Sequence, residues 1–290
     1  MVARLTNLQW DIGRRSLDLG GRPHVMGILN VTPDSFSDGG QHFNPSDAIS
    51  AALRMEDDGA SIIDIGGEST RPYSDPVSES EELKRVLPVI EGLSDRVQIP
   101  ISIDTSKANV ARAAVAAGAE IINDVTGLEG DPEMPSVVNQ YGVGVCVMHM
   151  QGTPQTMQDN PSYNDVVEEI HDYLAARLNA CLQLGIPKKR ICLDPGIGFG
   201  KSHAHNLQLV QNADFFLQSG VPILVGHSRK GFIGSLLGDK DTDRQAATLG
   251  VSLALASRGV HILRVHDVRE TVDALKLYCT CTAESSSGRS

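Results

Sequence analysis

The sequence has few aromatic residues, few cysteines and no long apolar run. Aromatic residues make up 4% of the 290 positions, and only one of them is tryptophan. No apolar run approaches the roughly 20 residues that a membrane-spanning helix needs, so we expect no membrane partner. The 5 cysteines lack CxxC spacing, which argues against a disulfide framework or a zinc site and favours the reducing cytoplasm. They are Cys146, Cys181, Cys192, Cys279 and Cys281.

Blocks of basic residues are also absent. The formal net charge is −11, from 25 Lys and Arg against 36 Asp and Glu. We therefore expect no nucleic-acid partner, although a local anion site is compatible with this charge. Charged residues at 21% and hydrophobic residues at 41% are typical of a globular chain rather than a disordered one or a coiled coil. The first 19 residues contain no apolar segment of a secretory signal, so we expect none.

One pattern repeats along almost the whole chain: a short β-branched apolar run, then an Ala- and Leu-rich helical stretch. Because each run is apolar throughout, both of its faces are expected to be buried, as in a parallel strand. The predicted strands are 24–30, 61–65, 99–103, 120–123, 144–148, 191–194, 222–226 and 262–265. The predicted helices are 46–58, 79–93, 107–117, 131–140, 163–184, 203–212, 243–258 and 268–278.

This alternation over about 250 residues predicts an α/β fold, a single (β/α)8 TIM barrel. The main alternative is an open doubly wound sheet, which requires a glycine-rich phosphate loop after its first strand. The corresponding segment, VTPDSFSDGG at 31–40, lacks GxGxxG, so the barrel is favoured. Residues 24–278 are assigned to the barrel, 1–23 to an N-terminal hairpin that plugs its bottom, and 279–290 to a disordered tail.

The residues at the carboxyl ends of the predicted strands differ in kind around the barrel. In a (β/α)8 enzyme these ends face the mouth, where the chemistry gathers. Strands eight, one and two contribute Arg264, His266, Asn30 and Arg71. Arginine offers a rigid fork of N–H donors and histidine a further donor, as a phosphate or pyrophosphate requires. We therefore predict an anion subsite on this side of the mouth.

Strands three, four and six end instead in hydrogen-bond acceptors. They contribute Asp104, Asn123 and Asp194, and a carboxylate accepts two parallel N–H bonds from one planar edge. Lys230 adds a donor suited to a ring carbonyl or nitrogen. The two halves together favour a planar nitrogen heterocycle that carries a phosphate ester. The glycine-rich loops after strands one and two are predicted to close over the mouth as lids.

Structural explanations remain open for several of these residues. Asp194 would cap the turn that follows it, and Lys230 would be an aldolase Schiff-base lysine or a solvated lysine at a helix start. Arg264 and His266 would pair with Asp267 or another barrel acid. Other residues are interpreted as structural: Met148 as pocket wall, His149 as a hydrogen-bonded histidine, Cys146 as core, and His203 and His205 as surface residues rather than a metal pair.

Seven segments of the sequence resemble motifs of the dihydropteroate synthases, pterin-binding enzymes of the folate pathway that sulfonamides inhibit. The segments are MGILNVTPDSFSDGG at 26–40, DIGGESTRP at 64–72, SIDT at 102–105, INDV at 122–125, DPGIGFGK at 194–201, SRK at 228–230 and RVHD at 264–267. Any one motif is weak, but together they are specific. The resemblance runs from about Leu8 to Tyr278.

The resemblance implies a transferase that condenses 6-hydroxymethyl-7,8-dihydropterin pyrophosphate with p-aminobenzoate, with Mg²⁺ as cofactor, in a homodimer formed through the late helices. It implies that the pterin contacts Asp104, Asn123, Asp194 and Lys230, and we count Met148, interpreted above as pocket wall, among the substrate-binding residues. It implies that the pyrophosphate contacts Asn30, Arg264 and His266, with Mg²⁺ near Asn30 and Asp38. It implies that the p-aminobenzoate site contains Phe36, Thr70, Arg71, Pro72, Phe199 and Ser228. The implied catalytic residues are Asp104, Lys230, Arg264 and His266.

The expected chemistry needs no nucleophilic side chain. Departure of pyrophosphate leaves a cation-like pterin methylene that the arylamine captures, while Arg264, His266 and Mg²⁺ offset charge on the leaving group. Three other functions stay open: a pterin-binding barrel that transfers methyl groups from methyltetrahydrofolate with a corrinoid partner, an inactive binding protein, and a phosphosugar aldolase that uses Lys230.

Overall fold

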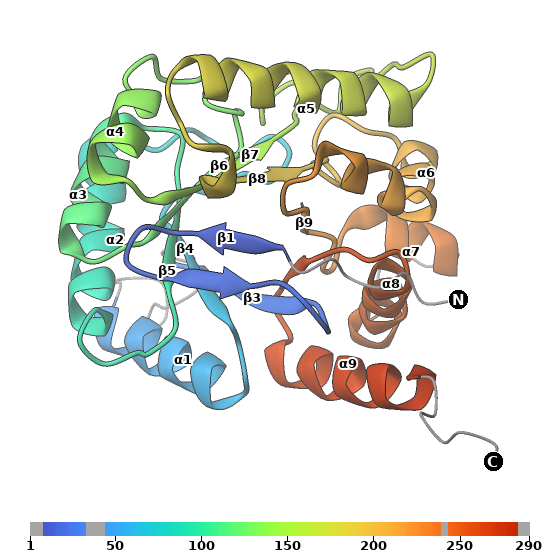
Figure 1. Cartoon of the computed structure of the whole chain (residues 1–290), viewed down its shortest axis with the longest axis horizontal. Helices are drawn as coiled ribbons and strands as arrows, with labels where there is room; N and C mark the ends of the chain where they lie inside the picture. The colour runs from blue at the N-terminus through green and yellow to red at the C-terminus, as the bar shows by residue number, and fades with distance from the viewer. Residues whose placement is uncertain (1–7, 33–43, 239–242, 284–290) are drawn as a thin grey trace.

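The computed structural model describes residues 8–32, 44–238 and 243–283, which form a ring of strands inside a ring of helices (Figure 1). The strands of the ring are β3 (His24–Asn30), β4 (Ile62–Gly66), β5 (Ile101–Asp104), β6 (Ile121–Asp124), β7 (Gly144–Met148), β8 (Ile191–Asp194), β9 (Leu224–Val225) and β10 (Ile262–Val265). They pair in parallel in the order β8-β7-β6-β5-β4-β3-β10-β9. A parallel bridge between Leu193 and Ile223 closes the ring, so the predicted barrel is confirmed.

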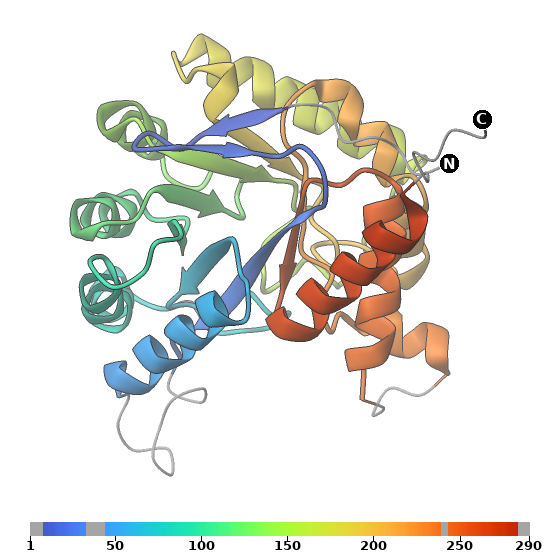
Figure 2. The same ribbon diagram turned by 60° about the horizontal axis from the view of Figure 1, so that its bottom comes forward.

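Helices pack around the outside of this barrel (Figure 2). Within the described residues they are α1 (Pro45–Asp57), α2 (Glu79–Leu93), α3 (Ala108–Ala117), α4 (Met134–Tyr141), α5 (Val166–Gln183), α6 (His203–Gln211), α7 (Gly231–Leu237), α8 (Gln245–Ser257) and α9 (Val268–Thr282). Two short 3₁₀ helices, η1 (Lys188–Arg190) and η2 (Ala213–Ser219), precede β8 and β9. Side-chain caps fix several starts, because the oxygens of Asn44, Ser78 and Asp165 accept backbone N–H groups in the first turns of α1, α2 and α5.

The N-terminal hairpin closes one end of the barrel. Strands β1 (Gln9–Asp11) and β2 (Ser16–Asp18) pair antiparallel, and in Figure 1 they lie in front of the barrel strands. Trp10 is fully buried, and its indole N–H donates to the carbonyl of Arg190 at 2.9 Å. Trp10, Ile12 and Leu19 pack against the first inward-facing residues of the strands, including Ile62. The predicted plug is therefore confirmed.

The side chains that point into the barrel form two layers: an apolar layer next to the plug and a polar layer nearer the carboxyl ends of the strands. Side chains two residues apart in a strand share one face. The inward residues Ile62, Ile121, Cys192 and Ile262 belong to the apolar cluster around the plug. Two positions further along the same strands stand Asp64, Asn123, Asp194 and Arg264. The polar side chains of the barrel interior are therefore concentrated toward the carboxyl ends of the strands.

Three elements differ from the sequence predictions. Helix α7 has no predicted counterpart, because its seven residues, GFIGSLL, contain two glycines and no polar face. Strand β9 is only two residues long. Helix α9 continues to Thr282, so the prediction of a disordered tail from residue 279 is wrong for its first residues. No glycine or proline interrupts the helix there, and the Thr280 hydroxyl donates to the Lys276 carbonyl at 2.7 Å. Residues 284–290 lie outside the described residues.

Two further predictions concern membranes and cysteines. Within residues 8–32, 44–238 and 243–283, no helix has both the length and the apolar character needed to cross a bilayer. All five cysteines are free thiols, and Cys146 is fully buried, in agreement with its expected place in the core.

Candidate functional site

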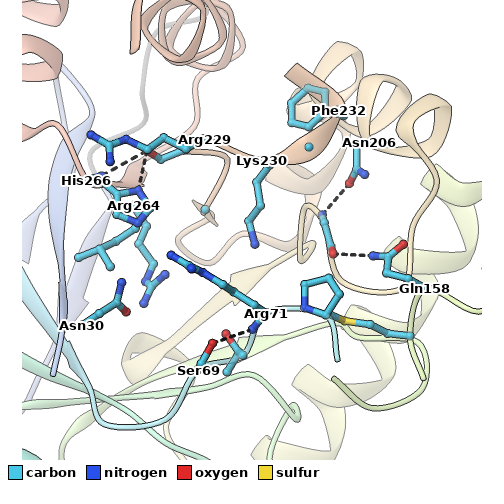
Figure 3. Close-up of a pocket in the computed structure, with 18 of the residues that line it drawn as sticks. Asn30, Ser69, Arg71, Gln158, Asn206, Arg229, Lys230, Phe232, Arg264 and His266 are labelled. Carbon is cyan, nitrogen blue, oxygen red and sulfur yellow. Dashed lines mark hydrogen bonds between the residues drawn. The ribbon is translucent and has the colours of Figure 1, made fainter. Parts of the chain in front are cut away.

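A cavity of about 1000 Å³ opens at the carboxyl ends of the barrel strands. Figure 3 shows side chains from several strands and loops converging on it. Nine predicted site residues line it, namely Asn30, Thr70, Arg71, Pro72, Asp104, Ser228, Lys230, Arg264 and His266. Four others are buried and are not part of the lining, namely Asn123, Met148, Asp194 and Phe199. The two remaining, Phe36 and Asp38, lie outside the described residues.

Arg264 lies at the centre of the polar layer and is held by two carboxylates. Its Nε donates to Oδ2 of Asp64 at 2.6 Å, and its Nη2 donates to Oδ2 of Asp104 at 2.8 Å. The side-chain amide of Asn123 also donates to Oδ2 of Asp64, at 3.1 Å. The predicted separation of cations and acceptors onto opposite sides of the mouth is therefore wrong. Spacing along the chain places residues at strand ends but does not say which of them are long enough to meet across the barrel.

Asp64, which the sequence reading missed, is not part of the cavity lining but bonds to Arg264, which is. It is fully buried, and its Oδ1 has no hydrogen-bond partner among the described residues. A buried acceptor without a partner is costly, so this atom is suited to a ligand N–H group. The available signal was the position of Asp64 two residues after inward-facing Ile62, in an otherwise apolar strand.

Burial and charge act in opposite directions on the Arg264 cluster. Burial raises the pKa of Asp104 to about 7, although the charge of Arg264 opposes this and Asp64 reinforces it. Burial also disfavours the charged form of Arg264, but the carboxylates of Asp64 and Asp104 outweigh it and raise the pKa of the guanidinium. Arg264 therefore stays charged, whereas Asp104 is able to exchange a proton near neutral pH.

Asp194 and Lys230 form a second part of the site. Oδ1 of Asp194 accepts the backbone N–H of Gly196 at 2.7 Å, which is the turn cap considered as its structural role. Burial raises the pKa of Asp194 to about 6, with Lys201, Arg264 and Lys230 opposing. The charge of Arg264 thus acts on Asp194, as expected if both belong to one site. Burial, reinforced by Arg264, lowers the pKa of Lys230 to about 8.

Phe199 and Ser228, both predicted site residues, contact Lys230 and His266. The Lys230 ammonium lies 4.1 Å from the ring centroid of Phe199, a cation–π contact that orients it. His266 Nδ1 lies 3.0 Å from the hydroxyl oxygen of Ser228. Burial lowers the pKa of His266 to about 4, so the imidazole is neutral at pH 7 and acts as a hydrogen-bonding group rather than a cation. Asp267 pairs with Arg229, not with Arg264.

Lys201 is a second residue that the sequence reading missed. It is 2% exposed, and its Nζ donates to the carbonyl of Phe199 at 2.8 Å and to Nδ1 of His149 at 2.9 Å. These bonds tie the end of β7 to the loop after β8, and they confirm His149 as a hydrogen-bonded structural histidine. Burial lowers the pKa of Lys201 well below its ordinary value. Its position at the end of the DPGIGFGK segment was the available signal.

The remaining cation of the predicted anion subsite is Arg71. Its side chain is exposed, and in Figure 3 it extends into the space between Asn30 and Lys230. Within the described residues, neither Arg71 nor Lys230 forms an ion pair with a carboxylate. The positive charge of Arg264 is already matched by two acids, so Arg71 and Lys230 add positive charge at the cavity that no carboxylate among the described residues pairs.

Histidine pairs do not form a metal centre in the part of the chain that the structure describes. His203 is exposed and lines the cavity, whereas His205 completes a capping box with Ser202 at the start of α6. No group of three or more His, Cys, Asp or Glu side chains within residues 8–32, 44–238 and 243–283 is arranged to hold a metal ion. The interpretation of His203 as a surface residue is confirmed, while His205 is partly buried.

A closed parallel barrel with buried carboxylates, an amide and cations around one cavity defines an enzyme that binds a planar hydrogen-bonding heterocycle together with an anion. The chain matches the family model described as pterin binding enzyme over residues 26–266. It is 48% identical over 262 residues to dihydropteroate synthase of Escherichia coli K12. The matched residues make up 90% of this chain and 92% of that protein.

Solved structures agree with this match. Dihydropteroate synthase of Xanthomonas albilineans with 4-aminobenzoic acid is 47% identical, with a TM-score of 0.89 over 96% of this chain and 100% of the other. The same enzyme in complex with 7,8-dihydropteroate is 45% identical, with a TM-score of 0.85 over 95% and 99% of the two chains. This chain belongs to the dihydropteroate synthase family of pterin-binding enzymes and is a transferase.

Proposed function

We propose that this chain condenses 6-hydroxymethyl-7,8-dihydropterin pyrophosphate with p-aminobenzoate, giving 7,8-dihydropteroate and pyrophosphate. One observation carries the proposal: Asp104, Lys230 and Arg264 line a single cavity, in a chain 48% identical to a dihydropteroate synthase. The relative from Xanthomonas albilineans binds 4-aminobenzoic acid in one structure and 7,8-dihydropteroate in another, which supports the same arylamine and product here.

The inner part of the barrel mouth is proposed to hold the pterin ring. Asp194 and Asp64 supply acceptors for the guanidine-like edge of the ring, and the Lys230 ammonium donates to a ring carbonyl or nitrogen. Asp64 and Asp194 stand in the polar layer above the plug, on β4 and β8, and the Lys230 side chain lines the cavity that opens above them. Asn123 is oriented by its bond to Asp64.

The outer part is proposed to hold the pyrophosphate. Arg264 uses two of its N–H groups on Asp64 and Asp104, and its remaining N–H groups are available to the leaving group. The neutral imidazole of His266 adds a donor on the same side, whereas Arg71 is proposed to face the carboxylate of the arylamine. Because Arg264 is fixed by two carboxylates, it needs no rearrangement when negative charge develops on the departing oxygens.

Mg²⁺ is part of the proposal, with Asn30 as one of its ligands. The Asn30 side chain lines the cavity beside Arg264, and an amide oxygen is a ligand that Mg²⁺ accepts. A magnesium ion typically keeps several waters and binds through one or two protein oxygens plus substrate phosphates, so a single described ligand fits this ion. When bound, it neutralises charge on the pyrophosphate. The second proposed ligand, Asp38, lies outside the described residues.

The proposed reaction passes through a cation-like pterin methylene. Asp104 lies within reach of the cavity, and its ionised form stabilises positive charge on the nearby ring. The arylamine nitrogen then forms the new C–N bond, and its proton leaves to solvent or to a carboxylate such as Asp104. Segment 68–77 and its neighbours limit access of water, which competes for the cation.

We also propose that a second copy of this chain covers an exposed apolar groove on α6, α7 and α8. The groove is lined by Leu207, Val210, Ile233, Leu236, Leu237 and Val251. Leu236 and Leu237 are 58% and 52% exposed, which is unusual for adjacent leucines. A dimer mass in light scattering after size exclusion supports this proposal, and a monomer across micromolar concentrations contradicts it.

Free thiols at all five cysteines support the proposed cytoplasmic location.

A direct assay tests the proposed activity. The purified chain is incubated with pterin pyrophosphate, labelled p-aminobenzoate and Mg²⁺, and labelled dihydropteroate is separated by chromatography. Product that forms only when both substrates are present supports the proposal. Trapping of substrate on Lys230 by borohydride, without dihydropteroate, would instead indicate the aldolase reaction.

A further inference from the structure

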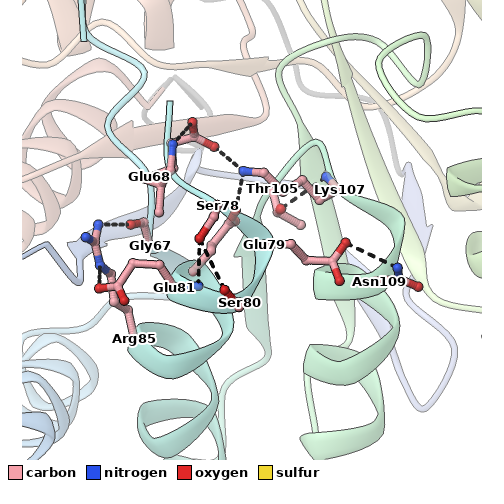
Figure 4. Close-up of polar contacts among 12 residues, drawn as sticks. Gly67, Glu68, Ser78, Glu79, Ser80, Glu81, Arg85, Thr105, Lys107 and Asn109 are labelled. Carbon is pink, nitrogen blue, oxygen red and sulfur yellow. Dashed lines mark hydrogen bonds and ion pairs between the residues drawn. The ribbon is translucent and has the colours of Figure 1, made fainter. Parts of the chain in front are cut away.

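Segment 68–77, between β4 and α2, contributes residues 68–73 to the cavity wall, and its ends are held by a polar cluster that has no part in the chemistry proposed above. We name this cluster, made of Glu68, Glu82, Arg85 and Lys107, the β4–α2 clamp. Figure 4 shows Glu68, Arg85 and Lys107 of this cluster. Oε1 of Glu68 accepts the backbone N–H of Val77 at 2.9 Å, so one side chain joins the first and last residues of the segment.

Lys107 connects this closed segment to the next strand of the barrel. Its Nζ contacts Oε2 of Glu68 and, at 2.5 Å, Oε2 of Glu82. The side chain of Glu82 is fully buried, and those of Lys107 and Glu68 are 24% and 22% exposed. Burial opposes the charged form of Lys107, but the two carboxylates outweigh it and raise the pKa of the ammonium. Charge-assisted bonds with limited water access are stronger than surface ion pairs.

The backbone of Lys107 is also held by a hydrogen bond, as its ammonium group is. Its backbone N–H donates to the Thr105 hydroxyl at 3.2 Å, directly after Asp104 at the end of β5. On the other side, Nη1 of Arg85 donates to the carbonyl of Gly67 at 2.8 Å, just before the segment begins. These contacts therefore connect segment 68–77 to the ends of β4 and β5, the strands that carry Asp64 and Asp104.

Within the segment, residues 69–74 form a smaller closed loop that contains most of its part of the cavity wall. The Ser74 hydroxyl donates to the carbonyl of Ser69 at 2.5 Å, and Thr70, Arg71 and Pro72 lie between these two. The outward part of the segment also meets the loop after β7, where the Tyr73 backbone N–H donates to the Pro154 carbonyl at 3.0 Å. Arg71 lies between Glu68 and Val77, which bond to each other, and Glu68 is held by Lys107. The position of the Arg71 side chain over the cavity thus depends on these bonds.

We propose that Glu68 and Lys107 are positioning residues that hold Thr70 and Arg71 over the cavity and thereby determine the affinity for the arylamine substrate. Lys107 is not part of the cavity lining, and Glu68, which is, acts in this role through its bonds to Lys107 and to the Val77 backbone N–H. The inference rests on the proposed function, because segment 68–77 forms the rim on which the arylamine is expected, away from the inner pterin pocket. Loss of the clamp is therefore expected to raise KM for p-aminobenzoate without weakening pterin binding.

The test compares Glu68→Gln and Lys107→Met with Lys107→Arg and Asn109→Ala. Asn109 donates to Glu79 at 3.2 Å, so it also joins the starts of α3 and α2 but does not contact segment 68–77 (Figure 4). Steady-state kinetics with p-aminobenzoate and Mg²⁺ give KM and kcat, and calorimetric titration with pterin pyrophosphate gives Kd. Circular dichroism melting gives Tm for each variant.

We expect Glu68→Gln and Lys107→Met to raise KM for p-aminobenzoate about tenfold, the effect of losing one charge-assisted bond from the arrangement that binds it. The values of kcat and of Kd for pterin pyrophosphate stay within twofold of wild type. Lys107→Arg restores most of the affinity because the charge is kept, and Asn109→Ala leaves all three constants unchanged.

Two results would overturn the inference. Unchanged KM in Glu68→Gln and Lys107→Met means that the clamp does not position the rim, and parallel loss of Tm, pterin binding and kcat means that it only supports the fold. Failure of the proposed function is distinguishable, because the wild-type chain would then form no dihydropteroate at all.

Discussion

Removal of Arg264 is expected to destabilise the protein more at high pH than at low pH. The substitution Arg264→Met keeps much of the side-chain volume but leaves the carboxylates of Asp64 and Asp104 without their cation. Both carboxylates are buried, with side chains 0% and 10% exposed, and Arg264 itself is 19% exposed. Removal of one partner from a buried ion pair typically costs about 3–5 kcal/mol, because an uncompensated charge stays inside the protein.

The raised pKa of Asp104 reduces this cost under acidic conditions. A carboxyl group with a folded pKa near 7 binds a proton in the folded state that the unfolded chain releases above about pH 4. Stability from this group is therefore present at low pH and is lost as the pH rises through 7 in the wild type. Without Arg264 the pKa of Asp104 rises further, and the loss continues above pH 7 at about 1.4 kcal/mol per pH unit.

We therefore expect Arg264→Met to lower the free energy of unfolding by about 2 kcal/mol at pH 6 and by about 3 kcal/mol at pH 8. Urea unfolding followed by far-ultraviolet circular dichroism at both pH values measures these differences. Arg269→Met is the control, since Arg269 is 70% exposed and its pair with Asp58 is solvated. A difference below about 1 kcal/mol at both pH values, or one that shrinks as pH rises, would refute the reasoning.

Two further predictions concern the pterin pocket and the plug. Pterin pyrophosphate should bind most tightly between about pH 6 and pH 8, because Asp194 must be ionised to accept N–H groups and Lys230 must be protonated to donate. Calorimetric titration across pH should lose the lower limb in Asp194→Asn and the upper limb in Lys230→Met, and a flat wild-type profile would contradict both roles. Trp10→Ala should cost about 3–5 kcal/mol in urea unfolding, because it empties the buried centre of the plug and removes the bond to Arg190. A loss of less than about 1 kcal/mol would show that the hairpin does not close the barrel.

The strands were the most predictable part of the fold. Those at His24–Asn30, Gly144–Met148, Ile191–Asp194 and Ile262–Val265 have the predicted bounds, because strands buried on both faces are apolar throughout and stop at the first polar residues. Helix α7 was not predictable in the same way. It is too short for a helical repeat, and its formation depends on burial of Phe232 and Ile233 against the rest of the chain.

The candidate site was predictable in its membership but not in its contacts. Residues at strand ends were found because a barrel gathers them at one mouth, and nine of them line the cavity. The bond between Arg264 and Asp64 joins residues 200 positions apart, and nothing in the spacing of the motifs specifies it. The buried bonds of Lys201 were equally invisible, since a lysine near a strand end is ordinarily solvated.

The amino-acid order alone determined the alternation of strands and helices, the barrel and the set of polar groups at its mouth, because periodic burial and strand ends are local properties of a chain. Only the folded structure decided which of those groups neutralise one another, which keep an unmatched charge for a ligand, and how segment 68–77 is held. These outcomes depend on distances between side chains of remote strands and on the exclusion of water around them, and both exist only after the barrel has closed.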